Sequence, residues 1–117
     1  MNIGMMQPTF LPWLGFFELI HKADVFIFLD DFQFSVQSYH QRNRLFVNRG
    51  QVDWYSVPIK KTLSYQMPLN KAQINEDIPW RIKAWKRIRQ NYGKAKYFKA
   101  YEAAIEKCKN EGGNFII

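Results

Sequence analysis

The amino-acid sequence predicts an α/β fold, in which an N-terminal βαβ unit with parallel strands is extended by a β-hairpin and followed by two C-terminal helices. Three patterns support this class. Two short apolar segments, residues 1–6 and 25–29, flank a segment whose apolar side chains recur at helical spacing. A Gly-containing turn signal then separates two strand-like segments, and two long segments with helical spacing follow. The length of 117 residues suits a single α/β domain spanning residues 1–117.

The N-terminal βαβ unit is predicted from the order strand, loop, helix, strand. Pro8 and Pro12 are disfavoured inside a sheet or helix, so residues 7–12 are expected to form a loop. Apolar side chains recur every three or four residues over 12–22, which indicates a helix with Pro12 at its first position. Residues 25–29 are continuously apolar, which is typical of a parallel strand buried on both faces.

A β-hairpin is predicted from two strand-like segments, residues 44–47 and 52–59. The sequence Asn-Arg-Gly at residues 48–50 separates them and favours a tight turn. Residues 32–41 mix polar and aromatic side chains and are expected to form a loop. Residues 60–75 lack a clear hydrophobic period, so irregular structure is predicted there.

Two helices are predicted in the last third of the chain. The first begins at Pro79 and ends near Tyr92, where Gly93 terminates it. The apolar face of this helix is expected to comprise Ile78, Ile82, Trp85, Ile88 and Tyr92. The second helix spans 97–109 and is expected to end at Gly112 and Gly113, before a new apolar segment over 114–117. Its inward side chains are expected to be Tyr97, Tyr101, Ala104, Ile105 and Cys108.

Composition limits the classes of protein. Hydrophobic residues make up 47% and aromatic residues 17% of the chain, which is enough apolar surface for a packed core. No segment approaches the roughly 20 apolar residues that span a bilayer, so no membrane insertion is expected. The N-terminus lacks the pattern of a signal peptide, and the single cysteine, Cys108, suits a reducing compartment. We therefore expect a cytoplasmic location.

Charge is unevenly distributed along the chain, whose formal net charge is +7. Residues 1–40 carry one Lys and four acidic residues, whereas residues 41–109 carry 16 basic and five acidic residues. Basic surfaces attract phosphate groups, so nucleotides, nucleic acids and anionic lipids are all conceivable partners. The sequence contains no P-loop, GxGxxG, HExxH, GxSxG or CxxC motif, and it therefore identifies no cofactor.

The first candidate site lies where the first strand leads into the first helix. Open α/β sheets bind ligands at this position, because free backbone N–H groups and the helix dipole face the crevice. Gln7 and Thr9 offer polar groups, and Gly15 allows a close approach of a ligand. We predict that these residues and Trp13 bind substrate. The alternative is a rigid, Pro-bracketed turn in which Trp13 belongs to the core.

The second candidate site follows the second predicted strand. Asp30 and Asp31 come directly after the buried segment, and Gln33 follows them. Adjacent carboxylates at this place can act as a base or bind an amine, a ribose or a cation. We predict that the two aspartates are catalytic and that Gln33 binds substrate. The alternative is a pair of residues that only terminates the strand.

The third candidate site is basic. Arg42 and Arg44 would share one face of a strand, where they could contact a phosphate or carboxylate, while Asn43 takes the other face. We predict that these three residues and Lys60 bind substrate, although a solvated surface charge pair is the alternative. No metal site is expected, because His21 and His40 are isolated histidines.

Together these segments resemble the WbqC-like protein family. The resemblance rests on MQPTFLPWLGFFELI, ADVFIFLDDFQF, QRNRL, WYSVPIKK and PWRIKAWKRIRQNYGKAKYF, which occur in this order over about residues 2–101. The family's recurring positions correspond here to Gln7, Pro8, Pro12, Gly15, Asp30, Asp31, Phe34, Asn43, Arg44, Trp54, Pro58, Trp80 and Arg81. Family members usually continue well past the end of this chain, so residues 1–117 can be the N-terminal part of a longer family domain.

The resemblance implies a bacterial protein connected with O-antigen and other surface polysaccharides, and for one branch the transfer of an amino acid such as glycine to a sugar. The start of the first helix also resembles the HxGH pattern of nucleotidyltransferases. Trp13 and Phe16 stand where its histidines would be, so adenylyl-transfer chemistry is not implied.

These observations lead to three hypotheses. The first is a transferase of surface polysaccharide biosynthesis that uses a nucleotide-linked or activated substrate; Asp30 or Asp31 would take the proton from the attacking amine or hydroxyl. The second is a non-enzymatic module that binds a nucleotide or an anionic sugar. The third, nucleic-acid binding, rests on the basic residues alone. Exposed aromatic residues make association into a homo-oligomer plausible.

Overall fold

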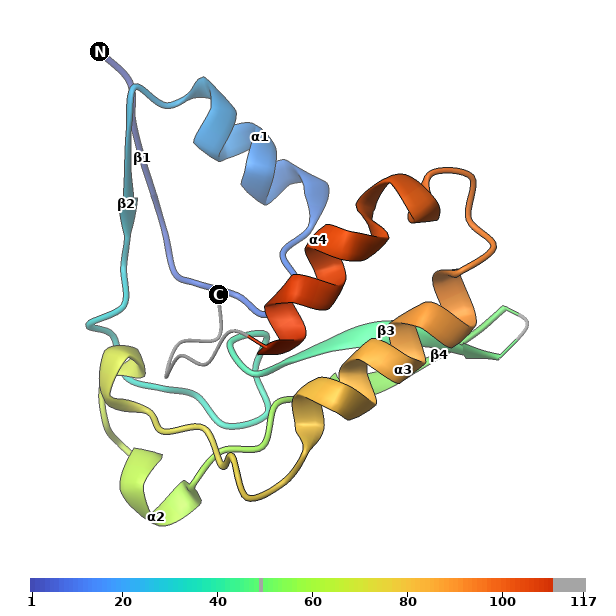
Figure 1. Ribbon diagram of the computed structural model, residues 1–117. Coiled ribbons are helices and arrows are strands. Elements are labelled where there is room, and N and C mark those ends of the chain that lie inside the picture. Colours follow the sequence, from blue (N-terminus) through green and yellow to red (C-terminus); the bar gives the residue numbers. More distant parts are fainter. Residues whose placement is uncertain (49, 111–117) are drawn as a thin grey trace.

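The computed structural model describes residues 1–48 and 50–110 and has the predicted α/β class (Figure 1). The expected helix end at Gly112 and Gly113 and the apolar segment 114–117 lie outside the described residues. The strands are β1 (Ile3–Met6), β2 (Val25–Phe28), β3 (Arg42–Asn48) and β4 (Gln51–Ser56). The helices are α1 (Leu14–Lys22), α2 (Lys61–Ser64), the 3-10 helix η1 (Leu69–Lys71), α3 (Trp80–Tyr92) and α4 (Phe98–Asn110).

The N-terminal βαβ unit forms, but α1 begins at Leu14 and not at the predicted Pro12. β1 and β2 pair in parallel, and α1 connects them and packs on one face of the pair. Phe16 of α1 is only 2% exposed, and its ring lies 5.8 Å from that of Phe26 and 6.3 Å from that of Phe28. A Cβ atom at Gly4 would lie 2.9 Å from the Phe26 ring, so the strand can approach this aromatic cluster only with glycine at that position.

The prediction that β2 is buried on both faces is wrong. Val25 and Ile27 are 45% and 42% exposed, and their partners in register, Ile3 and Met5, are 53% and 56% exposed. The sheet has two strands and α1 covers only one of its faces, so the alternating side chains of the other face have no layer above them among the described residues. The result is a bare apolar sheet face.

The β-hairpin also forms, with shifted ends. β3 begins at Arg42 rather than residue 44, and β4 ends at Ser56 because Pro58 cannot donate to the ladder. Gly50 has a φ of +86°, which explains the glycine in the turn, and a register irregularity lies between Phe46 and Asn48. Residues 60–75 are mostly irregular, as predicted, and contain the short helices α2 and η1.

Helix α3 packs across the hairpin (Figure 1). Its buried residues are Trp80, Ala84 and Trp85. The Tyr55 hydroxyl donates to the carbonyl of Trp80 at 2.6 Å. The prediction that Ile78 and Ile82 face inward is wrong, since they are 41% and 49% exposed. The two tryptophans fill the contact with the hairpin and turn the isoleucines outward.

Helix α4 corrects a further prediction. Tyr97 and Tyr101 are 64% and 63% exposed, and Ala104 and Cys108 are also exposed, whereas Ile105 is half-buried. Phe98 is instead the buried residue of α4, and its ring stacks on that of Trp85 at 6.3 Å. The aromatic contact at its first turn therefore holds the helix to α3, and most of the face predicted from helical spacing is exposed.

Phe16 and Phe17 offer a matched test of this packing. We expect Phe16→Ala to lower the free energy of unfolding by about 3–5 kcal/mol, because it removes the ring that α1 buries against β2. Phe17 is 55% exposed, and Phe17→Ala should cost less than about 1 kcal/mol. Urea unfolding followed by circular dichroism measures both, and equal losses would contradict the described orientation of α1.

Candidate functional site

The loop at residues 7–12 is fastened to the chain just before and within β3. The backbone N–H of Phe10 donates to the carbonyl of Tyr39 at 2.9 Å. The Asn43 side-chain amide donates to the carbonyls of Phe10 and Leu11 at 3.2 and 2.7 Å. Leu11 has a φ of +50°, which is unfavourable for leucine, so Asn43 holds the loop in a strained turn. Two of the predicted sites, the first loop and the Arg42–Arg44 segment, are thereby brought together.

A buried histidine completes this junction. His40 Nε2 lies 2.8 Å from Oε1 of Gln7, and His40 is only 8% exposed. Because the amide oxygen accepts, Nε2 carries the proton and Nδ1 has a free lone pair. Nδ1 is buried and has no partner among the described residues; the same holds for Oγ1 of Thr9. Burial lowers the pKa of His40 below its ordinary value of 6.5, so the ring is neutral at pH 7.

Sequence reasoning missed the role of His40. The residue lies 33 positions from Gln7 and has no second histidine beside it, so no local motif marks it. The neighbouring Tyr39-His40-Gln41-Arg42 segment was the available signal, but it does not reveal which residue is buried.

Arg42 and Arg44 lie over one indole ring. Their guanidinium carbons are 4.2 Å and 5.6 Å from the centre of the Trp54 ring, as expected for side chains on one face of β3. The Tyr39 ring is 5.7 Å from the same indole. We call these four residues the Arg–Trp cluster. Trp54 is 39% and Tyr39 50% exposed, so part of the aromatic surface is open to solvent beside the two cations that lie over the indole.

The two arginines of this cluster are not neutralised by the described part of the chain. The ion pairs of the described residues engage Lys22, Arg81, Arg87, Arg89 and Lys109. Nε of Arg42 is buried without a hydrogen-bond partner among the same residues. Arg44 is exposed and Arg42 is half-buried, so an anionic ligand would reach their outer guanidinium N–H groups rather than the buried Nε of Arg42.

Asp30 and Asp31 leave the same edge of the parallel sheet as Gln7. The N–H of Leu29 donates to the carbonyl of Met6 at 3.0 Å, which holds the two strand ends together. Beyond that point, Asp30 contacts Asn70: its carbonyl accepts from the Asn70 N–H at 2.8 Å and its carboxylate lies 3.5 Å from the Asn70 amide. Asp31 is exposed.

The contacts of the remaining predicted site residues are with parts of the chain outside the Arg–Trp cluster. Gln33 forms an isolated bridge with Pro68. Trp13 is 56% exposed and packs on Phe16, and a Cβ at Gly15 would clash with the Trp13 indole. The exposed Lys60 donates its backbone N–H to Gln73.

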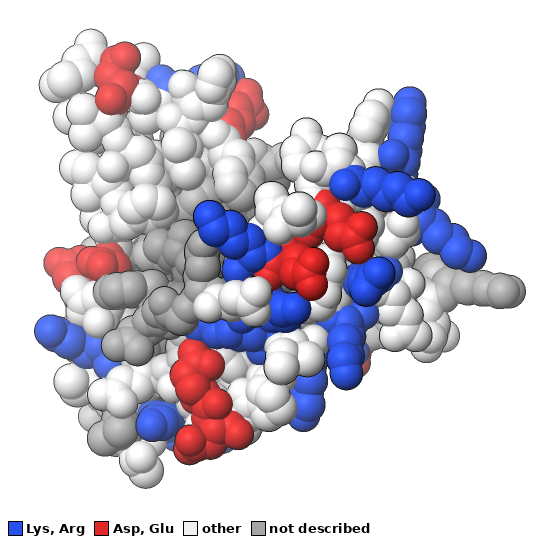
Figure 2. All heavy atoms as spheres, viewed as in Figure 1, with Lys and Arg blue, Asp and Glu red and all other residues white. Residues whose placement is uncertain are grey.

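The charged side chains of α3 are all basic, whereas α4 and the segment before α3 carry acidic residues that pair with some of them. Figure 2 shows Asp and Glu interspersed with Lys and Arg on this side, whereas the part formed by β1, β2 and α1 is largely uncharged. Arg81 pairs with Glu76 at 2.8 Å and Arg89 with Glu102 at 3.2 Å. Such paired charges are typical of a solvated face rather than of a continuous nucleic-acid surface.

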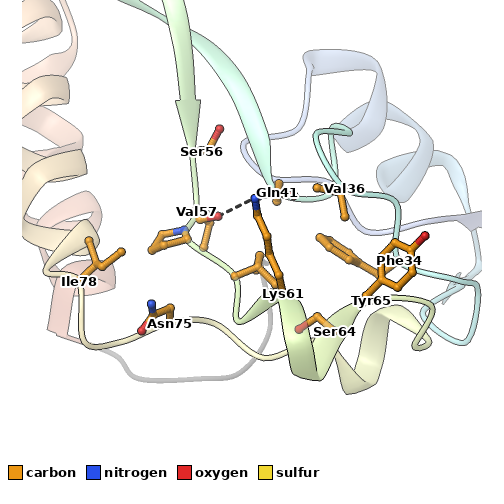
Figure 3. A pocket seen from close by; sticks show the side chains of 12 residues that line it. Phe34, Val36, Gln41, Ser56, Val57, Lys61, Ser64, Tyr65, Asn75 and Ile78 are labelled. Atoms are coloured by element: carbon orange, nitrogen blue, oxygen red, sulfur yellow. Dashed lines mark hydrogen bonds between the residues drawn. The ribbon is translucent and has the colours of Figure 1, made fainter.

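The described part of the chain contains no group of three or more His, Cys, Asp or Glu that could hold a metal ion. None of its helices is long and apolar enough to cross a bilayer. A cavity of about 320 Å³ lies at the base of the hairpin, and the predicted site residues are not part of its lining (Figure 3).

Comparisons with known proteins assign the chain to a family. The model of the WbqC-like protein family matches residues 7–116, and the chain therefore belongs to that family, as the ordered segments predict. The uncharacterized protein Rv1507c of Mycobacterium tuberculosis is 28% identical over 97 residues, which are 83% of this chain and 41% of that protein. The chain thus spans less than half the length of this relative. No solved structure matches it.

The buried neutral His40 makes stability depend on pH. Its folded-state pKa lies below 6.5, so between these two values the unfolded chain binds more protons than the folded one. We expect stability to be fully present above pH 6.5 and to fall as the pH drops toward the lowered pKa. Urea unfolding midpoints between pH 5 and 8 measure this loss.

Two histidine variants test whether His40 causes this loss of stability. His40→Gln should flatten the fall below pH 6.5, while His21→Gln, on the exposed side of α1, should retain the profile of the parent. If His40→Gln keeps the parent profile, the group responsible lies elsewhere.

Proposed function

We propose that this WbqC-like chain provides the substrate-binding part of a transferase in bacterial surface polysaccharide (O-antigen) assembly, with a nucleotide-linked or otherwise activated sugar as substrate. The Arg–Trp cluster is the observation that carries the proposal. The family context supports the pathway class, and transfer of an amino acid such as glycine to a sugar is the form of the reaction we favour. Such substrates suit the cytoplasmic location expected from the composition.

The cluster matches the two chemical parts of an activated sugar. Guanidinium groups donate paired hydrogen bonds to phosphate oxygens, and those of Arg42 and Arg44 lie 4.2 and 5.6 Å from the centre of one ring. The exposed faces of Trp54 and Tyr39 offer a stacking surface for a base or a sugar ring. A ligand that carries a ring next to a phosphate would use both parts at once.

The strained loop extends this binding surface. Asn43 uses its amide to hold the loop, and its neighbours on β3 are the two arginines. Gln7 is oriented by His40, and the unpartnered hydroxyl of Thr9 lies two residues away in the same loop. In the proposal Gln7 and Thr9 position the substrate, and His40 acts as a positioning residue.

Binding of UDP-glucose tests the proposal directly. A hydrogen bond to a charged group contributes about 1.5–3 kcal/mol, so Arg44→Ala should weaken binding by roughly 10- to 100-fold. Trp54→Ala should weaken it as well, because it removes the stacking surface under both arginines. Isothermal titration calorimetry with UDP-glucose, UDP and glucose 1-phosphate gives the affinities and shows which part of the ligand is recognised.

Two matched variants separate geometry from charge. Arg44→Lys keeps the charge but loses the planar pair of donors, and should bind at an intermediate level. Lys83→Ala removes an exposed cation from α3, and should change affinity by less than about twofold. If Lys83→Ala and Arg44→Ala weaken binding equally, net charge alone explains the loss of affinity, and the proposed site is wrong.

The proposed base is tested by turnover. Asp30 and Asp31 remain the proposed acceptors of the proton from the attacking amine or hydroxyl. In the step tested, the glycine amine attacks the anomeric carbon of a bound UDP-sugar, the bond from that carbon to UDP breaks, UDP leaves, and the aspartate takes the amine proton. Asp30→Asn or Asp31→Asn should therefore abolish measurable release of UDP, while Asp77→Asn, at an exposed position before α3, should not. Unchanged turnover in both variants would remove the base, and binding without turnover in the parent would favour a non-enzymatic module.

A further inference from the structure

We propose that the cavity at the base of the hairpin is a second binding site, for a compact apolar molecule that carries one anionic end, such as a medium-chain or aryl carboxylate. The cavity has a volume of about 320 Å³ and lies between the end of β4, the loop that carries Phe34, and α2 (Figure 3). The site is separate from the Arg–Trp cluster and does not depend on the function proposed for it.

The walls of the cavity are largely apolar. Val36 and Ile78 are 42% and 41% exposed and offer apolar surface to a ligand together with Ile59, while Phe34 and Val57 of the lining are buried at 3% and 0% exposed. A cavity of about 150 Å³ lined by apolar side chains holds benzene, so roughly twice that volume admits an eight-carbon chain or a substituted ring. Burial of such a body against these walls is favourable because it removes apolar surface from water.

The inner polar groups of the cavity already have partners in the protein. The Gln41 amide donates to the carbonyl of Val57 at 3.2 Å, and its oxygen accepts from the N–H of Gln37 at 3.0 Å. Oγ of the fully buried Ser64 accepts from the N–H of Gln73 at 2.9 Å. A strongly polar ligand would find few free groups here, and this favours an apolar body.

The charge of the lining defines the other end of the ligand. Lys61, at the start of α2, is the cation of the lining, and none of the lining residues is an Asp or Glu. Lys61 is exposed and pairs with no carboxylate of the described residues. An anion at the rim would therefore meet a free positive charge, whereas a cation would be repelled.

The cavity and the Arg–Trp cluster are neighbours in the structure. The Phe34 ring that lines the cavity lies 6.3 Å from the His40 ring, and Gln41 separates His40 from Arg42 in the sequence. Phe34 thus contacts the cavity on one side and His40, the partner of Gln7, on the other. The cavity can be probed by itself, because its lining includes none of the residues of the cluster.

Titration of the ¹⁵N-labelled chain with octanoate, followed by NMR, tests the proposal. We expect saturable shifts of the Gln41, Val57 and Ser64 amides, and weaker binding of octylamine, which has the same chain with the opposite charge. Lys61→Glu should weaken octanoate binding by about fivefold or more, because it replaces attraction by repulsion at a partly exposed site. Lys60→Glu is the matched control, since Lys60 lies outside the lining, and should change binding by less than about twofold.

A second pair of variants covers the case in which Lys61→Glu disturbs α2. Ile78→Asp places a carboxylate on the lining and should weaken octanoate binding, whereas Ile82→Asp introduces the same charge at an exposed position outside it. Three results would overturn the proposal: shifts concentrated at the bare face of Ile3, Met5, Val25 and Ile27, equal effects within each pair of variants, or no saturable shift at all.

Discussion

The junction between the first loop and the start of β3 is the constraint on which the candidate site depends. β1 and β2 form one sheet and β3 and β4 another, and no strand pairing connects them in the described residues. Hydrogen bonds from Phe10 to Tyr39 and from Asn43 to Phe10 and Leu11 fasten one sheet to the other. The Phe10 ring is buried in the cluster that contains Val57, Ile74 and Trp80, so apolar burial and hydrogen bonding act at the same place.

Aromatic residues have two roles in this chain, and burial distinguishes them. Phe16, Trp80 and Phe98 are at most 8% exposed and join α1 to β2, α3 to the hairpin and α4 to α3. Trp54 is a member of neither core cluster and lies under two cations with 39% of its surface exposed. The Trp54 side chain thus holds two arginines rather than packing in the core, and this favours a role in binding over a role in packing.

Predictions from the sequence were correct for features that depend on neighbouring residues. They were wrong where the burial of a face depends on an element that is distant in the sequence. The turn at Gly50 and the alternation of Arg42 and Arg44 on one face follow from local geometry, and both predictions agree with the structure. The burial of β2 and of the Tyr97 face of α4 was predicted wrongly, because a period reveals which side chains share a face and not whether another element covers it. The pairing of Gln7 with His40 across 33 positions had no local signal.

The protonation state of His40 is part of the architecture of the junction. Nε2 donates to Gln7 in either state, so protonation would not break that hydrogen bond. It would instead place a proton on the buried Nδ1, which has no acceptor among the described residues. Burial of the charged ring opposes protonation, and it is the cause of the lowered pKa of His40. A neutral ring therefore orients Gln7 and leaves the positive charge of this region to the two arginines that face the open surface.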